Sequence, residues 1–125
     1  MSSLFAKKRN AKRIEFEGGL WVDVRTLSKG EKDAFETETM QLMKGVEYED
    51  RDGKMVPKDG MFPPEVLQKL KDIEYRMITA SITSWSEDAV EISVETVKEL
   101  ADDVFTKIDK EVATLNNLTP AERKN

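Results

Sequence analysis

Apolar and polar residues alternate along residues 14–25, on both sides of a pair of glycines. Alternation with a period of two is typical of a half-buried strand, and glycine reaches the positive φ values that tight turns need. The pattern therefore predicts a β-hairpin that turns at Glu17-Gly18-Gly19. The faces of its second strand would carry Leu20, Val22 and Val24 on one side, and Trp21, Asp23 and Arg25 on the other. Because an isolated hairpin is marginally stable, this one must pack on helices, pair with another strand or bind a partner.

The next two segments differ in character. Residues 29–44 have helical spacing, and Ser28 and Glu31 before and within them have the spacing of a capping box, in which each side chain satisfies the other's backbone N–H. The buried positions expected in this helix are Ala34, Phe35, Leu42 and Met43. Residues 46–62 are acidic and contain Asp52-Gly53, a strong turn signal. They predict either a protruding small hairpin or a mobile loop.

Two further segments follow the 3.6-residue period of amphipathic helices. One spans 64–83 and begins at Pro64, which needs no N–H partner in a first turn. The other spans 94–116, follows a Ser93 cap and carries an unbroken apolar stripe. The stripe comprises Val97, Leu100, Ala101, Val104, Phe105, Ile108, Val112 and Leu115. Between these helices, an apolar and partly β-branched run leaves the first of them at residues 82–85.

These elements predict a single α+β domain that is mainly α, with an N-terminal β-hairpin packed on a bundle of about three helices. A chain of 125 residues commonly builds one core. The domain is expected to span 14–118, with the acidic hairpin or loop 46–62 inside it. Residues 1–13 predict a basic flexible arm, and residues 119–125 a polar tail.

Charge is unevenly distributed along the chain. The net charge is −5, whereas residues 1–13 hold five basic residues and no acid, so residues 14–125 carry −10. A basic arm can contact nucleic acid, but the pI near 4.9 lacks the basic footprint of nucleic-acid-binding domains, so we favour a solvated terminus. No apolar run approaches the roughly 18 residues of a membrane span, and the N-terminus lacks a signal-peptide core. We expect a soluble cytoplasmic protein.

The composition also limits the chemistry. The chain has no His and no Cys, the commonest side chains for proton transfer and thiol chemistry at neutral pH. Adjacent acids such as Asp102-Asp103 do not converge on a helix, as paired-carboxylate hydrolysis requires. Segment 47–53 fits a calcium loop poorly, because Tyr48 falls where a carboxylate ligand is needed. We therefore expect no catalytic residue, metal ion or cofactor, and a protein that acts by binding other chains.

Two tryptophans are the first candidates for a partner contact, because Trp is enriched at interface hot spots. We assign Trp85 to the core, and leave Trp21 open between core and interface because it lies on the polar face of its strand. The hairpin edge and the long third helix are the expected sources of apolar binding surface. The candidate partner-binding residues are Leu20, Trp21, Val22, Arg25, Val104, Phe105 and Ile108.

The order of these parts resembles the tail assembly chaperones of siphovirus-type bacteriophages. Residues 19–28 (G-L-W-V-D-V-R-T-L-S) look like that family's turn and strand running into its first helix. Residues 82–86 (I-T-S-W-S) look like its short apolar segment with a tryptophan, and residues 115–120 (L-N-N-L-T-P) like its C-terminal end. The acidic segment 46–62 has no counterpart in the pattern.

The resemblance implies a protein that binds the tape-measure protein before tail polymerisation and helps to recruit tail-tube subunits. It would act in the host cytoplasm and be absent from the mature virion, and such genes often also give a longer frameshifted product. Homo-oligomerisation is left open. The alternatives are a virion structural protein (a head–tail connector or minor tail protein), a nucleic-acid-binding regulator that uses residues 7–13, and, least favoured, a carboxylate-dependent hydrolase.

Overall fold

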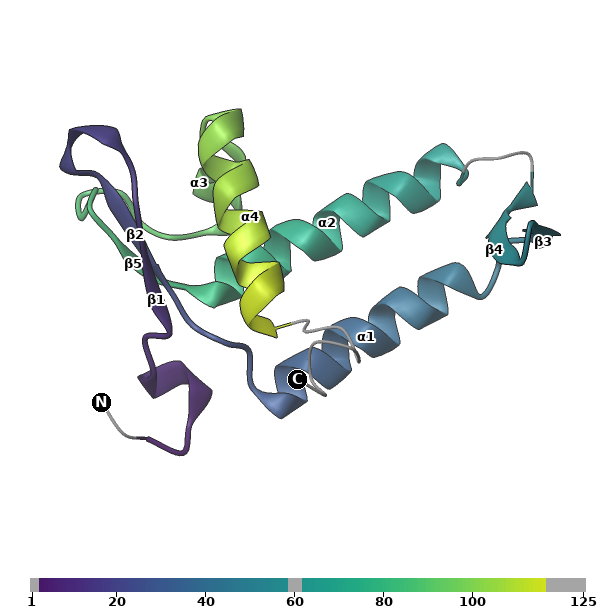
Figure 1. Cartoon of the computed structure of the whole chain (residues 1–125), viewed down its shortest axis with the longest axis horizontal. Helices are drawn as coiled ribbons and strands as arrows, with labels where there is room; N and C mark the ends of the chain where they lie inside the picture. The colour runs from purple at the N-terminus through teal and green to yellow at the C-terminus, as the bar shows by residue number, and fades with distance from the viewer. Residues whose placement is uncertain (1–2, 59–61, 117–125) are drawn as a thin grey trace.

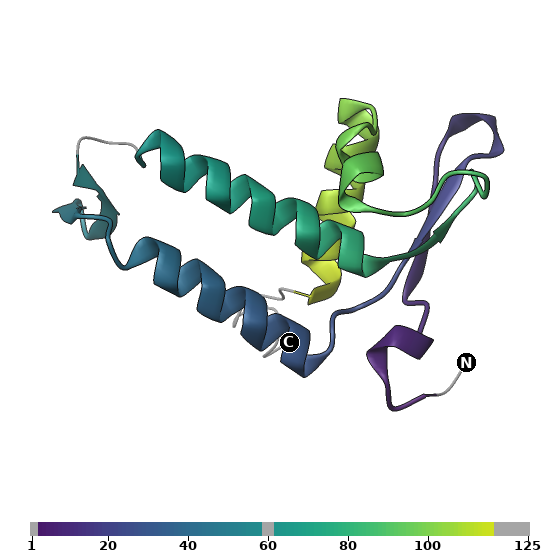
Figure 2. The ribbon, with the colours of Figure 1, turned by 180° about the vertical axis from the view of Figure 1, so that it is seen from behind.

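The computed structural model describes residues 3–58 and 62–116 (Figures 1 and 2). Its elements in chain order are β1 (Lys12–Glu15), β2 (Trp21–Val24), α1 (Lys29–Met43), β3 (Tyr48–Arg51), β4 (Lys54–Pro57), α2 (Pro64–Ser81), β5 (Ile82–Trp85), α3 (Val94–Lys98) and α4 (Asp102–Asn116). Short 3-10 turns lie at Ala6–Lys8 and Glu17–Gly19. The predicted polar tail, 119–125, lies outside the described residues.

The predicted fold class, a hairpin on a bundle of about three helices, is wrong. The described residues form four α-helices and two small antiparallel sheets, one with strand order β1-β2-β5 and one with β3-β4. The helices do not form one bundle: α1 and α2 run side by side away from the three-stranded sheet, whereas α3 and α4 lie near the sheet end of α2 (Figure 1). The N-terminal hairpin itself is present.

The hairpin is stabilised by a third strand that the sequence pattern did not identify. In β1 and β2, Ile14 faces Val22, and the turn uses Gly18 and Gly19 at φ of 79° and 77°. Strand β5 directly follows α2 and pairs with the other edge of β2, with Val22 opposite Trp85. Pairing with β5 therefore stabilises the hairpin, which would be marginally stable alone.

The main core lies between this sheet and helices α2, α3 and α4. Its buried apolar residues are Ile14, Val22, Val24, Ile78, Ile82, Trp85, Val97, Ile108 and Val112. The assignment of Trp85 to the core is confirmed, since only 8% of it is exposed. Val24 and Ile108 have no exposed surface, so the central strand and α4 contribute the deepest positions.

Helix α1 lies outside this core. None of its residues is buried, so the prediction of buried Ala34, Phe35, Leu42 and Met43 is wrong: Ala34 is exposed and the other three are half-buried. The reason is that α1 packs mainly on α2, where Arg76 of α2 forms an ion pair with Glu38 of α1.

The predicted long third helix is divided in two. Helix α3 starts with a reciprocal Ser93–Thr96 cap and ends at Lys98, and α4 starts anew when the Ala101 carbonyl accepts a bond from the Phe105 N–H. Two aspartates open α4, where negative charge is favourable at the positive end of the helix dipole. The apolar stripe continues across the break, which is why its period predicted a single helix.

The acidic segment forms a hairpin at the far end of the α1–α2 pair (Figure 2). Strands β3 and β4 pair around Asp52 and Gly53, which adopt the positive φ values of a tight turn. Of the two predictions for 46–62, the hairpin is therefore confirmed for its described part, whereas residues 59–61 lie outside the described residues. Along the described stretches, no helix has both the length and the apolar character that a membrane crossing requires.

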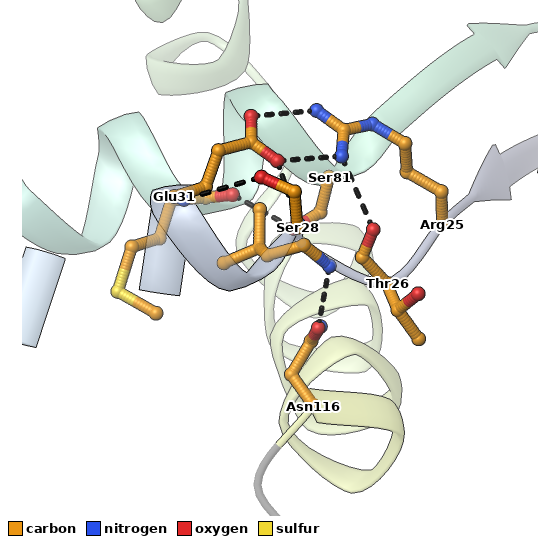
Figure 3. Close-up of polar contacts among 8 residues, drawn as sticks. Arg25, Thr26, Ser28, Glu31, Ser81 and Asn116 are labelled. Atoms are coloured by element: carbon orange, nitrogen blue, oxygen red, sulfur yellow. Dashed lines mark hydrogen bonds and ion pairs between the residues drawn. The ribbon is translucent and has the colours of Figure 1, made fainter. Parts of the chain in front are cut away.

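Residues between β2 and α1 hold the sheet, α1, α2 and α4 together (Figure 3). The buried Arg25 guanidinium donates two hydrogen bonds to the Glu31 carboxylate, at 2.8 and 2.9 Å. The same carboxylate accepts from the Ser28 N–H, and the Ser28 hydroxyl accepts from the Glu31 N–H, so the predicted capping box is confirmed. The Leu27 N–H donates to the side chain of Asn116, the last residue of α4, at 2.7 Å.

This junction predicts a specific acid sensitivity. The hydrogen bonds from Arg25, and also those from Ser28, lower the pKa of Glu31 from 4.5 to about 2. Because the folded-state pKa lies below the unfolded one, the stabilisation is complete above pH 4.5 and is lost as the pH falls toward 2. Its size at neutral pH is on the order of 3 kcal/mol. Relative to the wild type, Glu31→Gln should lower the free energy of unfolding by most of this amount at pH 7 and by little at pH 2.5.

Urea unfolding followed by circular dichroism at several pH values would test this. Glu36→Gln, at an exposed position on the same helix, is the matched control and should follow the wild type at every pH. A constant difference between wild type and Glu31→Gln from pH 7 to pH 2.5 would contradict the assignment.

Candidate protein-binding groove

An open apolar groove of about 450 Å³ lies between the hairpin turn and helices α3 and α4. Leu20 and Trp21 contribute one wall, Leu100 and Val104 the opposite wall, and the buried Trp85 lies between them. Two exposed carboxylates, Glu87 and Glu99, also border the groove. The groove thus combines an apolar lining with an acidic edge.

The turn geometry places Leu20 at the surface. The Phe16 N–H donates to the Leu20 carbonyl at 2.8 Å, which closes the turn around the two glycines. Leu20 is 49% exposed, although the strand it precedes is almost entirely buried. Full burial of an exposed Leu side chain contributes about 1.5–3 kcal/mol of free energy. Because part of Leu20 is already buried, a partner that covers the rest would gain a corresponding fraction of that amount.

Trp21 is fixed from two sides. Its N–H donates to the Ser86 hydroxyl and its carbonyl accepts from the Ser86 N–H, at 3.0 and 2.9 Å. The Arg13 guanidinium lies 3.8 Å from the centre of the indole ring, a cation–π arrangement. Arg13 is itself held by two hydrogen bonds to the buried Asp23 carboxylate, which lower the pKa of Asp23. Contacts within the fold therefore hold Trp21 in place.

The loop after β5 is fixed as well. The Trp85 indole N–H donates to the Val90 carbonyl at 2.9 Å, and this leaves the Val90 side chain 42% exposed at the groove. Thr96, in the first turn of α3, donates its hydroxyl proton to the Glu91 carbonyl at 2.7 Å. Because hydrogen bonds of the fold position both walls, the groove is preformed and costs little ordering entropy on binding.

The structure brings together four of the seven candidate partner-binding residues. Leu20, Trp21, Val22 and Val104 all line the groove. Val22 is only 5% exposed, so it contributes shape more than contact area. The remaining three, Arg25, Phe105 and Ile108, lie elsewhere.

Those three residues serve the fold. Arg25 is buried in the junction with Glu31, and Ile108 has no exposed surface, so neither can meet a partner in this conformation. Phe105 packs edge-on against Tyr75 of α2, with ring centres 5.5 Å apart. These assignments followed from treating 94–116 as one helix and the hairpin edge as free. Both assumptions fail, because α3 and α4 are separate and β5 pairs with the other edge of β2.

Val90 and Leu100 belong to the groove and were not among the candidates. Leu100 fits the apolar period of the helix, so the sequence indicated a core position. The Asp102-Asp103 pair after it was the available signal, because acidic residues favour a helix N-terminus. Nothing in the local sequence of Val90 indicated its approach to the hairpin turn, which depends on the β2–β5 pairing.

No three His, Cys, Asp or Glu side chains among residues 3–58 and 62–116 come close enough together to hold a metal ion. The arrangement at the groove is suited to holding apolar side chains near an acidic edge. Comparison of the chain with protein-family models, curated proteins and solved structures found no match. The site is an open apolar groove bounded by the hairpin turn and by helices α3 and α4.

Replacing the two tryptophans should have unequal effects on stability. Trp85→Ala removes a buried side chain together with its hydrogen bond to Val90 and should lower the free energy of unfolding by about 3 kcal/mol or more. Trp21→Ala removes a half-exposed side chain and its contact with Arg13, which should cost about 1 kcal/mol. Urea unfolding followed by circular dichroism measures both, and equal losses would contradict these roles.

Proposed function

We propose that this protein is a phage tail assembly chaperone that holds an apolar segment of the tape-measure protein in the groove beside Leu20 and helps to recruit tail-tube subunits. It acts in the host cytoplasm and is absent from the mature virion. The observation that carries the proposal is a preformed apolar groove with Leu20 and Val90 partly exposed beside it. The resemblance of three sequence segments to that family supplies the client.

The geometry supports a binding role of this kind. A chaperone that shields apolar segments must offer apolar surface of its own, and a preformed groove can do so without a further folding step. Glu87 and Glu99 favour client segments with basic residues beside the apolar ones. The net charge of −5 helps to keep a complex of this protein with an apolar client soluble.

Co-expression with the tape-measure protein encoded nearby tests the proposal. The wild-type chain should keep that client soluble and co-purify with it. Leu20→Asp places a charge in the groove and should lower the soluble client at least about tenfold, because the carboxylate would have to be desolvated on binding. Leu67→Asp is the matched control, since Leu67 on α2 is similarly exposed, at 41%, and lies outside the groove.

Either of two results would contradict the proposal: an insoluble client beside a folded wild-type chain, or full activity of Leu20→Asp. Mass spectrometry of purified virions addresses the alternative of a structural protein. The proposal predicts no abundant peptides from this chain there, and a stoichiometric amount in the particle would favour the head–tail connector or minor tail protein instead.

A further inference from the structure

A second, smaller groove of about 270 Å³ lies between α1, α2 and α4. Most of its lining is apolar, and includes Ile73 and Met77 of α2 and Val112 of α4. Two carboxylates also line it, Glu74 from α2 and Asp109 from α4. Figures 1 and 2 show α4 crossing α2, with the C-terminal end of α4 toward the start of α1. None of the residues at this groove also lines the groove beside Leu20.

Glu74 is exposed and Asp109 is half-buried at the edge of this groove. Neither forms an ion pair with another described residue, whereas seven other ion pairs are present in the same parts of the chain. Burial raises the pKa of both groups, and the charge of Asp109 raises that of Glu74 further, against a smaller opposing effect of Lys71. Two like charges beside an apolar groove repel each other, and a cation bound between them would relieve that repulsion.

We propose that this groove binds an apolar segment of a partner protein that carries a lysine or arginine, with its cation placed between Glu74 and Asp109. A basic side chain offsets both negative charges, and its aliphatic stem can cover the apolar lining. The volume suits one or two side chains better than a whole small-molecule ligand, for which pockets of roughly 300 Å³ or more are usual. Two carboxylates also provide fewer oxygens than the six to eight that Ca²⁺ takes, which favours a protein cation over a metal ion.

This arrangement makes stability and binding respond in opposite directions. Glu74→Gln with Asp109→Asn removes both charges and keeps the shapes, so the free chain should become more stable. The same change should weaken binding of the basic segment. If the two carboxylates instead stabilised the fold, the same double substitution would lower the stability of the free chain. The proposal does not require the client of the other groove to be the tape-measure protein.

The probe is a synthetic amphipathic peptide with one central arginine flanked by leucines, beside the same peptide with uncharged citrulline in place of arginine. Fluorescence anisotropy should show the full-length wild type binding the arginine peptide about tenfold more tightly than the citrulline peptide. The Glu74→Gln/Asp109→Asn variant should lose this preference and melt at a higher temperature than the wild type. Glu36→Gln/Asp88→Asn, at two exposed acids that line neither groove, should change neither property.

Binding to Leu20→Asp separates the two grooves. Its preference for arginine should match the wild type, even where the proposed chaperone activity is absent. Four results would overturn the proposal: no binding of either peptide at millimolar concentration, equal affinity of the wild type for both, a preference that survives in the double variant, or loss of binding in Leu20→Asp. A lower melting temperature of the double variant would also overturn it, because a cation of this chain would then already pair with the carboxylates.

Discussion

Strand β2 and the residue that follows it carry two buried charged side chains, Asp23 and Arg25, and each is paired with an opposite charge. Asp23 and Arg25 are 5% and 6% exposed. Asp23 accepts two hydrogen bonds from Arg13 of β1, and Arg25 donates two to Glu31 of α1. A buried charge without its partner costs several kcal/mol, so these pairs specify where β1 and α1 attach to the central strand. They act as geometric constraints as much as sources of stability.

The candidate groove depends on this constraint. The N-terminal end of β2 places Trp21 in the groove wall, and its partner strand β5 leads into the loop that places Val90 opposite the hairpin turn. Beyond its C-terminal end, Leu27 donates to Asn116 and so fixes the end of α4. One short strand therefore positions the groove and connects it to α1 and α4, while α1 itself remains outside the main core.

Local rules predicted the elements that short-range chemistry determines. The capping box of Ser28 and Glu31 and the glycine turn of the first hairpin depend on residues within a few positions of one another, and both are present. Strand β5 and the break between α3 and α4 depend on contacts made across the fold. The apolar period of the sequence continues through both, so it gave no sign of either. The groove follows the same division: Trp21 was a candidate because of its type, whereas Val90 reaches the groove only through tertiary structure.

Native-state hydrogen exchange of the free protein tests the central claim, that the groove is preformed because β2 and its paired charges are fixed. The backbone N–H groups of Trp21, Arg25 and Leu27 donate to Ser86, Ser81 and Asn116 respectively. All three should exchange only through global unfolding, with the free energy measured for the deepest core amides. Exchange of these amides through local openings several kcal/mol smaller would contradict this claim, since the groove would then have to form on binding.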